Sequence, residues 1–320
     1  MPKVSVIIPV YGVEKYIERC ARSLFEQTLD DIEYLFIDDC TPDKSVEVLK
    51  QVMEDYPQRE PQVTIHSMEQ NSGQAMVREW GMKNVSGEFV IHCDSDDWVD
   101  SDMYALMYDK AVSEDADIVI CDYYKSDGKN HKVVRMGVES SSKEELINNL
   151  LCHKLQPAVW NKLVKRSCYT SKVVFPTNNM AEDLALMVQL FYFSSKIAYI
   201  NKPFYYYYFN QTSITGSTSF DNVFKRVVQY QNNVCFIEKF LSEKEDRRIF
   251  QNGMRHLKFS VKNELCKSEY DQRFNEIWKS LFPELSLLDV ILLKNSKFKA
   301  KLLYIASFFG LYGYYNRYFK

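Results

Sequence analysis

The chain has 320 residues, enough to bury a substantial core in one large domain or two. Its formal net charge of −3 is nearly balanced, so bulk electrostatics give no indication of nucleic acid binding. The eight cysteines include no CxxC pair, which argues against structural zinc and against a disulfide scaffold, and favours a reducing, cytoplasmic location. The N-terminal segment lacks the flanks of a signal peptide, and no apolar run reaches the roughly 18 residues of a membrane-spanning helix.

The first 124 residues show strands alternating with helices. Apolar runs predict the strands, and the stretches between them carry apolar residues at helical spacing. The expected strands are Val4–Val10, Glu33–Asp39, Val63–His66, Phe89–Cys93 and Ile118–Cys121. This alternation predicts an open, mostly parallel α/β sheet, and such sheets bind ligands outside the carboxyl ends of their strands.

Beyond residue 124 the alternation ends. A polar loop is expected at Lys125–Lys132. The other expected elements are helices at Lys143–His153 and Leu184–Phe193, a short strand from Trp160, and strands at Ile197–Ile200 and Phe204–Phe209. A Ser/Thr/Gly-rich segment over 212–219 predicts a boundary near residue 217. Residues 1–217 would then form one domain and residues 218–320 a helical C-terminal region.

The most informative stretch is Gly87–Val99, where a short buried strand ends in Asp94-Ser95-Asp96-Asp97. Carboxylates this close repel one another, and a divalent cation with oxygen ligands would relieve the repulsion. A DxD at the end of a strand therefore predicts a clamp for a metal and a diphosphate. The alternative is an acidic N-cap for a helix at Ser101–Val112, and the stretch alone favours neither. Two other strand ends, Pro9-Val10-Tyr11 and Asp38-Asp39, lie at the same expected edge and favour a ligand site.

Several short motifs occur in a fixed order over residues 3–216. They are VSVIIPVYGVEKYIERCARSL, IDDCTPDKS, NSGQAMVREWG, GEFVIHCDSDDWV, WNKL, AED and YYYYFNQTSIT. Together they resemble the family 2 inverting glycosyltransferases of the bacterial surface-polysaccharide type. The resemblance implies a GT-A fold, a Rossmann-like, mostly parallel sheet flanked by helices, with a helical C-terminal region. It also implies that the enzyme uses Mg²⁺ or Mn²⁺ to move a hexosyl or N-acetylhexosaminyl group from a nucleotide-sugar, expected to be a UDP-sugar. The acceptor would be a glycan or a lipid-linked acceptor.

The resemblance assigns the nucleotide side of the site. Pro9 and Tyr11 match the loop that packs on the base and ribose, and Asp38 matches the carboxylate that accepts a hydrogen bond from the nucleobase. Asp39 is expected to shape the turn. Arg78 matches a basic position near the nucleotide, and the alternative is a solvated charge on a helix.

The same resemblance assigns different roles to the carboxylates of the acidic stretch. Asp94 resembles the ribose contact, and Asp96 resembles the metal ligand that holds the diphosphate. Asp97 could be a second ligand or a helix cap, and the cap is the favoured interpretation.

Asp183 of the AED motif is the expected catalytic base, because inversion needs a group that removes the proton of the acceptor hydroxyl. A carboxylate suits this role if partial desolvation raises its pKa. The alternative is that Glu182 and Asp183 only pair with a helix dipole. Trp160 and Asn161 are expected on the acceptor side, although a core Trp is the simpler explanation.

Two departures from the family pattern stand out. Cys40 occupies a position in the Asp-Asp turn where Gly would be easier. Val77-Arg78-Glu79 replaces the more usual Ala-Arg-Asn and keeps the Arg.

The tail, residues 294–320, contains no Asp or Glu and is rich in Lys and aromatic residues. This pattern suits a helix lying at the surface of a membrane, which would place the protein on the cytoplasmic face of the inner membrane. A helix packed on the protein, or across a homodimer, explains the pattern equally well.

Two other functions are alternatives for a chain with these strands, helices and acidic motifs. A non-catalytic nucleotide-binding or scaffold protein would not need the DxDD and AED motifs. The presence of both motifs in this chain therefore argues against this alternative. A nucleotidyltransferase would carry a Gly- and basic-rich phosphate loop near the first strand, and VYGVEK has little of it.

Overall fold

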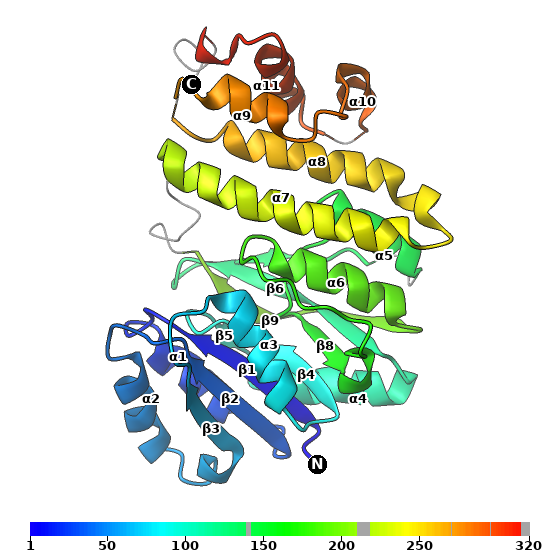
Figure 1. Cartoon of the computed structure of the whole chain (residues 1–320). Helices are drawn as coiled ribbons and strands as arrows, with labels where there is room; N and C mark the ends of the chain where they lie inside the picture. The colour runs from blue at the N-terminus through cyan, green and yellow to red at the C-terminus, as the bar shows by residue number, and fades with distance from the viewer. Residues whose placement is uncertain (139–141, 210–217, 270, 295, 315–320) are drawn as a thin grey trace.

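The computed structural model describes residues 1–138, 142–209, 218–269, 271–294 and 296–314. A central sheet flanked by helices forms one end of the molecule, and a stack of helices forms the other end (Figure 1). This arrangement confirms the predicted α/β fold with a helical C-terminal region. The expected boundary near residue 217 lies outside the described residues.

In the described residues the sheet has nine strands in the order β3-β2-β1-β4-β8-β6-β9-β5, with β7 paired to β6. They are β1 (Val4–Val10), β2 (Ile32–Asp38), β3 (Val63–Ser67), β4 (Phe89–His92), β5 (Trp98–Val99), β6 (Ile118–Ser126), β7 (His131–Val134), β8 (Lys162–Lys165) and β9 (Ile197–Tyr208). Strands β3, β2, β1 and β4 are parallel, and so are β6 and β9. β5, β7 and β8 run antiparallel to their partners, so the second half of the sheet is mixed.

Two predicted features of the second half were wrong. The segment 125–132, predicted as a loop, contains the end of β6 and the start of β7, which pair as a hairpin. The two strands predicted at 197–200 and 204–209 form the single strand β9, because an irregularity opposite Asp122 lets the strand continue past Pro203.

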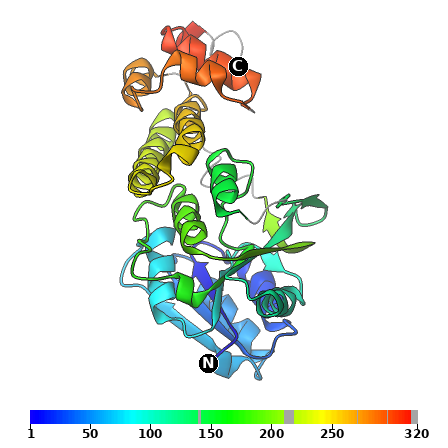
Figure 2. The same ribbon diagram turned by 90° about the vertical axis from the view of Figure 1, so that its right-hand side faces the viewer.

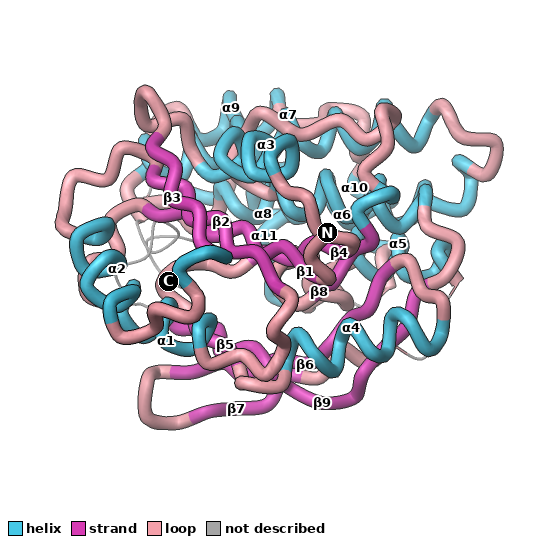
Figure 3. Tube along the Cα trace, turned by 90° about the horizontal axis from the view of Figure 1, so that it is seen from below, coloured by secondary structure: helices cyan, strands magenta, loops and turns pink. Residues whose placement is uncertain are grey.

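The alternation of side chains along β1 explains why helices cover both faces of the sheet. Val4, Val6 and Ile8 pack on one face against helices α1, α2 and α4, whereas Ile7 packs on the other face against α3. Figure 3 shows α1, α2 and α4 on one side of the strands and α3 on the opposite side. The helices of this half are α1 (Ile17–Phe25), α2 (Ser45–Glu54), α3 (Gln74–Asn84), α4 (Met103–Glu114), α5 (Lys143–Leu151) and α6 (Glu182–Phe193).

The C-terminal helices stack on α6 and continue away from the sheet. They are α7 (Phe220–Ser242), α8 (Gln251–Leu265), α9 (Phe274–Ser280), α10 (Leu287–Leu292) and α11 (Phe298–Phe308). Figures 1 and 2 show α7 and α8 side by side next to α6, with α9, α10 and α11 beyond them. One hydrophobic cluster includes Ile118 of β6, Leu186 of α6, Val227 of α7 and Leu257 of α8, so the helical region shares its core with the sheet.

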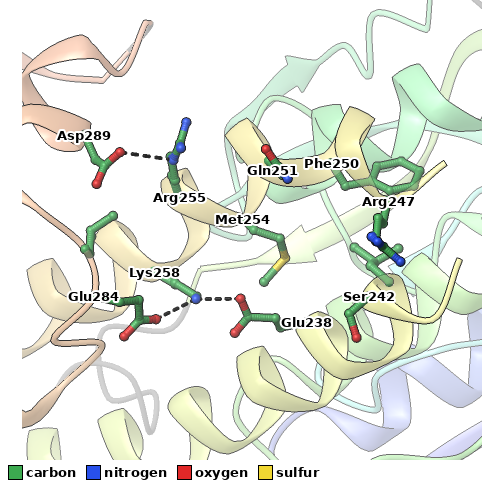
Figure 4. A pocket seen from close by; sticks show the side chains of 12 residues that line it. Glu238, Ser242, Arg247, Phe250, Gln251, Met254, Arg255, Lys258, Glu284 and Asp289 are labelled. Atoms are coloured by element: carbon green, nitrogen blue, oxygen red, sulfur yellow. Dashed lines mark hydrogen bonds and ion pairs between the residues drawn. The ribbon is translucent and has the colours of Figure 1, made fainter. Parts of the chain in front are cut away.

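Ion pairs fasten α10 to this stack around a cavity of about 400 Å³ (Figure 4). Lys258 of α8 lies 2.6 Å from both Glu238 of α7 and Glu284, and Arg255 lies 3.2 Å from Asp289 of α10. Each of these charged side chains has an oppositely charged partner in another part of the helical region, so we interpret this cavity as part of the helix packing. Within the described ranges, no helix combines the length and the apolar composition that crossing a bilayer requires.

Candidate active site

The parallel strands β1, β2 and β4 bring three sequence motifs to one edge of the sheet. Val10 at the end of β1 is paired with Asp38 at the end of β2, and β4 ends two residues before Asp94. The Ser95 hydroxyl donates a hydrogen bond of 2.6 Å to the carbonyl oxygen of Pro9. The three strand ends that carry the predicted nucleotide-binding residues therefore meet in space.

The two carboxylates after β2 have different surroundings. Asp38 accepts hydrogen bonds from the backbone N–H of Thr41 at 2.8 Å and the hydroxyl of Ser67 at 3.0 Å. Asp39 is buried and accepts the backbone N–H groups of Ser72 at 2.7 Å and Gly73 at 2.8 Å. Asp39 thus ties the turn before α3 to the end of β2, in line with the turn-shaping role expected for it.

The loops next to these carboxylates leave Tyr11 accessible. The Tyr11 side chain is 50% exposed beside this edge, which leaves its ring free to pack on a ligand. Cys40 has a φ of 56°, in the left-handed region that favours glycine, which explains why glycine would be easier at this position.

Asp97 does not cap a helix, so the favoured interpretation of this residue was wrong. Helix α4 begins only at Met103, because the short strand β5 follows Asp97 and pairs with β9. Asp97 is fully buried and accepts the Tyr205 hydroxyl and the backbone N–H of Tyr208, both at 2.6 Å. Its role is to fasten the acidic turn, residues 94–97, to β9.

Asp96 carries a carboxylate that no ion pair neutralises in the described parts of the chain. Burial and the nearby charge of Asp94 raise the pKa of Asp96 to about 6. The same ranges contain no cluster of three or more His, Cys, Asp or Glu residues that could enclose a metal. Mg²⁺ and Mn²⁺ fit such an open site, because they take one or two carboxylates and complete their coordination with water and phosphate oxygens.

Arg78 joins the acidic turn to the AED motif. Its guanidinium lies 2.7 Å from an Asp94 oxygen and also forms an ion pair with Glu182. Arg78 is 4% exposed, so it is not the solvated helix charge that was the alternative. Gln74, one turn earlier on α3, donates to the same Asp94 oxygen at 3.1 Å. Asp94 and Glu182, 88 positions apart in the sequence, are therefore held on one guanidinium.

Asp183 is the second residue of α6, and the helix begins directly after a residue with unusual backbone geometry. Ala181 has a φ of 64°, a conformation that costs a non-glycine residue about 1 kcal/mol. Burial raises the pKa of Asp183, while the positive charges of Arg78 and Lys162 oppose that rise. The Asp183 carboxylate accepts the backbone N–H of Leu184 at 2.7 Å.

A cavity of about 640 Å³ connects these groups. Its lining comes from α3, the acidic turn, the segment 153–160, the start of α6, β9, α7 and α8. The lining residues are Gln74, Arg78, Asp94, His153, Gln156, Pro157, Ala158, Val159, Trp160, Met180, Ala181, Glu182, Asp183, Leu184, Tyr207, Tyr230, Ser260, Asn263, Glu264 and Lys267. Four of the predicted site residues do not line this cavity and lie toward the carboxyl ends of β1, β2 and β4: Pro9, Tyr11, Asp38 and Asp96.

The two residues expected on the acceptor side lie differently. Trp160 lines the cavity and stacks on Tyr205 at 4.2 Å between ring centroids. Asn161 is fully buried and does not line the cavity; its amide donates to the carbonyl oxygen of Cys121 at 2.8 Å. Asn161 also accepts the ammonium of Lys162 at 2.8 Å, so it supports the cavity wall from behind.

Lys162 of the WNKL motif is a structural feature that sequence reasoning missed. Its buried ammonium also donates to the carbonyl oxygens of Gln156 at 2.8 Å and Ala158 at 2.7 Å. Burial lowers the pKa of Lys162 to about 7. A lysine at the start of a short strand, directly after Trp and Asn, was the available signal for this anchor.

Comparisons with known proteins agree with this geometry. Residues 5–173 match the sequence profile of Glycosyl transferase family 2. The chain is 30% identical over 252 residues to the uncharacterized glycosyltransferase EpsJ of Bacillus subtilis, and the alignment covers 75% of this chain and 71% of EpsJ.

Two solved structures share the fold. The crystal structure of S. aureus TarS 1-349 in complex with UDP has a TM-score of 0.72 and 18% identity, covering 98% of this chain and 89% of that one. The mannosyltransferase PcManGT from Pyrobaculum calidifontis, in complex with GDP-Man and Mn²⁺, has a TM-score of 0.59 and 15% identity, covering 100% and 88%. These neighbours confirm the predicted GT-A type of fold. Because the family profile matches more than half of the chain, the protein belongs to glycosyltransferase family 2 and is a transferase enzyme.

Proposed function

We propose that the enzyme transfers a sugar from a nucleotide-sugar, with a UDP-sugar as donor, to a hydroxyl of a glycan or lipid-linked acceptor in polysaccharide biosynthesis, with inversion at the anomeric carbon. The observation that carries this proposal is the meeting of the acidic strand end and the AED motif at one cavity, joined by Arg78. The UDP bound to TarS supports a uridine donor, and the Mn²⁺ bound to PcManGT supports a divalent cation.

The donor would lie along the sheet edge and enter the cavity with its sugar. Pro9 and Tyr11 would pack on the nucleoside, Asp38 would accept a hydrogen bond from the base, and Asp94, held by Arg78, would contact the ribose. Asp96 would hold Mg²⁺ or Mn²⁺, which when bound supplies a Lewis acid for the charge on the departing diphosphate.

Asp183 would act as the general base. An inverting transfer needs a proton acceptor close to the attacking hydroxyl and on the side of the sugar opposite the nucleotide. Burial makes the Asp183 carboxylate more basic than an exposed one, while the positive charges of Arg78 and Lys162 oppose this rise in its pKa. Glu182 cannot take the same role while Arg78 holds it.

Thermal unfolding with UDP and Mn²⁺ tests the donor proposal. Ligand present at 100 times its Kd stabilises the folded state by about 2.7 kcal/mol, so UDP and Mn²⁺ together should raise the Tm more than either alone. Slow hydrolysis of one member of a panel of UDP-, GDP- and dTDP-sugars would then identify the donor. If the protein binds UDP but hydrolyses no sugar nucleotide, the result favours a non-catalytic binding protein. If nucleoside triphosphates raise the Tm more than UDP does, the result favours a nucleotidyltransferase.

The C-terminal helices offer a surface that suits an anionic membrane, which we propose as the place of action. On α11, Tyr304 faces inward and donates to the carbonyl oxygen of Leu285 at 2.6 Å. Apolar side chains on the other side of α11 and on α10 remain exposed. This α10–α11 surface consists of Leu288, Ile291, Leu292, Phe298, Leu302 and Phe309.

Basic side chains surround this surface. Lys294, Lys297 and Lys299 are all exposed, so anionic lipid headgroups complement the surface in charge while its apolar side chains enter the interface. A homodimer through the same surface is the competing outcome, and it would bring like charges of two copies together.

A further inference from the structure

The wall of the active-site cavity farthest from the sheet is built by α7 and α8. Ser260, Asn263 and Glu264 of α8 line the cavity, and Lys267 lines it from the turn that follows the helix. Their spacing of i, i+3, i+4 and i+7 places them on one face, which we call the α8 stripe. The face of α8 around Val261 is fully buried in the hydrophobic core.

The polar groups of the α8 stripe are held in fixed positions. The Glu264 carboxylate lies 3.7 Å from Arg226 on one oxygen and 2.5 Å from Lys267 on the other, so two cations orient it. The side-chain oxygen of Asn263 is buried, and no hydrogen-bond partner for it exists among the described residues. A buried amide oxygen without a partner is costly, and a donor from a bound ligand would remove that cost.

Aromatic rings also line this cavity. Tyr207 is 37% exposed, and its ring stacks on that of Trp160 with centroids 5.8 Å apart. The Tyr230 hydroxyl lies 3.1 Å from a ring nitrogen of His153. Flat rings offer contact to the C–H faces of a sugar, while hydroxyl, amide and carboxylate groups match its many hydroxyls.

The charges of the lining select against an anionic ligand. Carboxylates come from Asp94, Glu182, Asp183 and Glu264, whereas the cationic side chains are Arg78 and Lys267. Burial lowers the pKa of His153, so this residue adds no positive charge at neutral pH. Arg226 pairs with Glu264 and Lys162 lies near Asp183, so the cations offset the carboxylates. The cavity carries no net positive charge, and a neutral ligand therefore enters at a lower cost than an anionic one.

We propose that the α8 stripe is the acceptor subsite, and that it binds the hydroxyl-rich end of a neutral glycan. This inference rests on the proposed glycosyl transfer, because the subsite gains its purpose from the nearby Asp183. Asn263 receives a hydrogen bond from an acceptor hydroxyl, Glu264 receives a second, and Tyr207 contacts the sugar ring. The C-terminal helices thus determine which acceptor reaches the base.

Saturation-transfer NMR on the full chain with UDP and Mn²⁺ tests the subsite. The probes are neutral disaccharides of hexoses and N-acetylhexosamines, with glucuronic acid-containing disaccharides as the anionic counterparts. Asn263→Ala should weaken binding of the neutral disaccharide by about 10-fold or more, because it removes a desolvated hydrogen-bond acceptor. Ser260→Ala, a second variant on the same stripe, should weaken it less. Asn252→Ala, an exposed position on the same helix outside the cavity, is the matched control and should bind as the wild type does.

Donor binding separates this inference from the proposed function. All the variants should bind UDP within about 2-fold of the wild type, because the α8 stripe lies away from the sheet edge. A wild type that does not bind UDP refutes the proposed transfer reaction itself. A wild type that binds UDP but no neutral disaccharide, or prefers the anionic ones, overturns the subsite. Unchanged binding in folded Asn263→Ala and Ser260→Ala proteins overturns it as well.

Discussion

Replacing Asp96 by Asn should stabilise the metal-free protein at neutral pH. The folded chain holds the Asp96 proton more tightly than the unfolded chain, because the pKa rises from 3.8 to about 6 on folding. The free energy of unfolding must then fall as the pH rises through the window between these two values. A difference of about 2 pKa units corresponds to about 3 kcal/mol, which is the cost of the ionised carboxylate at pH 7.5. Asp96→Asn removes the charge and hence this cost.

Urea unfolding at several pH values, with a chelator present, measures the effect. We expect Asp96→Asn to raise the free energy of unfolding at pH 7.5 by up to about 3 kcal/mol, and the gain to vanish near pH 4, where Asp96 of the wild type is protonated. With UDP and Mn²⁺ the order should reverse, because the variant has lost the carboxylate for the metal. Asp115→Asn, whose carboxylate is 94% exposed, is the control and should change little. A variant that gains no stability at pH 7.5 would refute the raised pKa of Asp96. A variant that keeps the full stabilisation by Mn²⁺ and UDP would refute its role as the metal ligand.

Three other variants test separate parts of the structure. Asp183→Asn should lower kcat by about 100-fold or more with UDP affinity unchanged, and a variant that loses UDP binding would show that Asp183 is structural. Lys162→Met should lower the free energy of urea unfolding by about 2–4 kcal/mol, because it leaves buried acceptors without a donor; an unchanged value would contradict the anchoring role. The wild type should sediment with phosphatidylglycerol vesicles at low salt and Phe298→Ser/Leu302→Ser should not, with Leu106→Ser on α4 as the control. Concentration-dependent dimerisation without vesicle binding would identify a homodimer surface instead.

The fold of the first half could be predicted because its signals are local. β1 and β4 are short, mostly apolar runs, and such runs indicate buried strands without any knowledge of the tertiary structure. β5 was missed because two residues are too short to show any periodicity. The continuity of β9 was missed because Pro203 normally interrupts a strand, and only the irregular pairing with Asp122 makes it acceptable there.

The nucleotide side of the candidate site was visible in the sequence, whereas the far wall was not. Parallel strands bring their carboxyl ends together, so the residues after β1, β2 and β4 could be grouped without a structure. Ser260, Asn263 and Glu264 look like the solvent face of an amphipathic helix, because polar residues at helical spacing have the same pattern beside water and beside a cavity. Their approach to Asp183 depends on how α7 and α8 stack on α6, which no local pattern encodes.

Amino-acid substitutions on the two faces of α8 have different effects on the stability of the fold. Exchanging side chains on the buried face opens voids or causes overpacking in the core shared with the sheet, at a cost of several kcal/mol for each large change. Exchanging Ser260 or Asn263 alters only the lining of a cavity that already contains free volume. Relatives of this enzyme can therefore alter this lining through a few positions one helical turn apart, while the helix that carries these positions keeps its place in the fold.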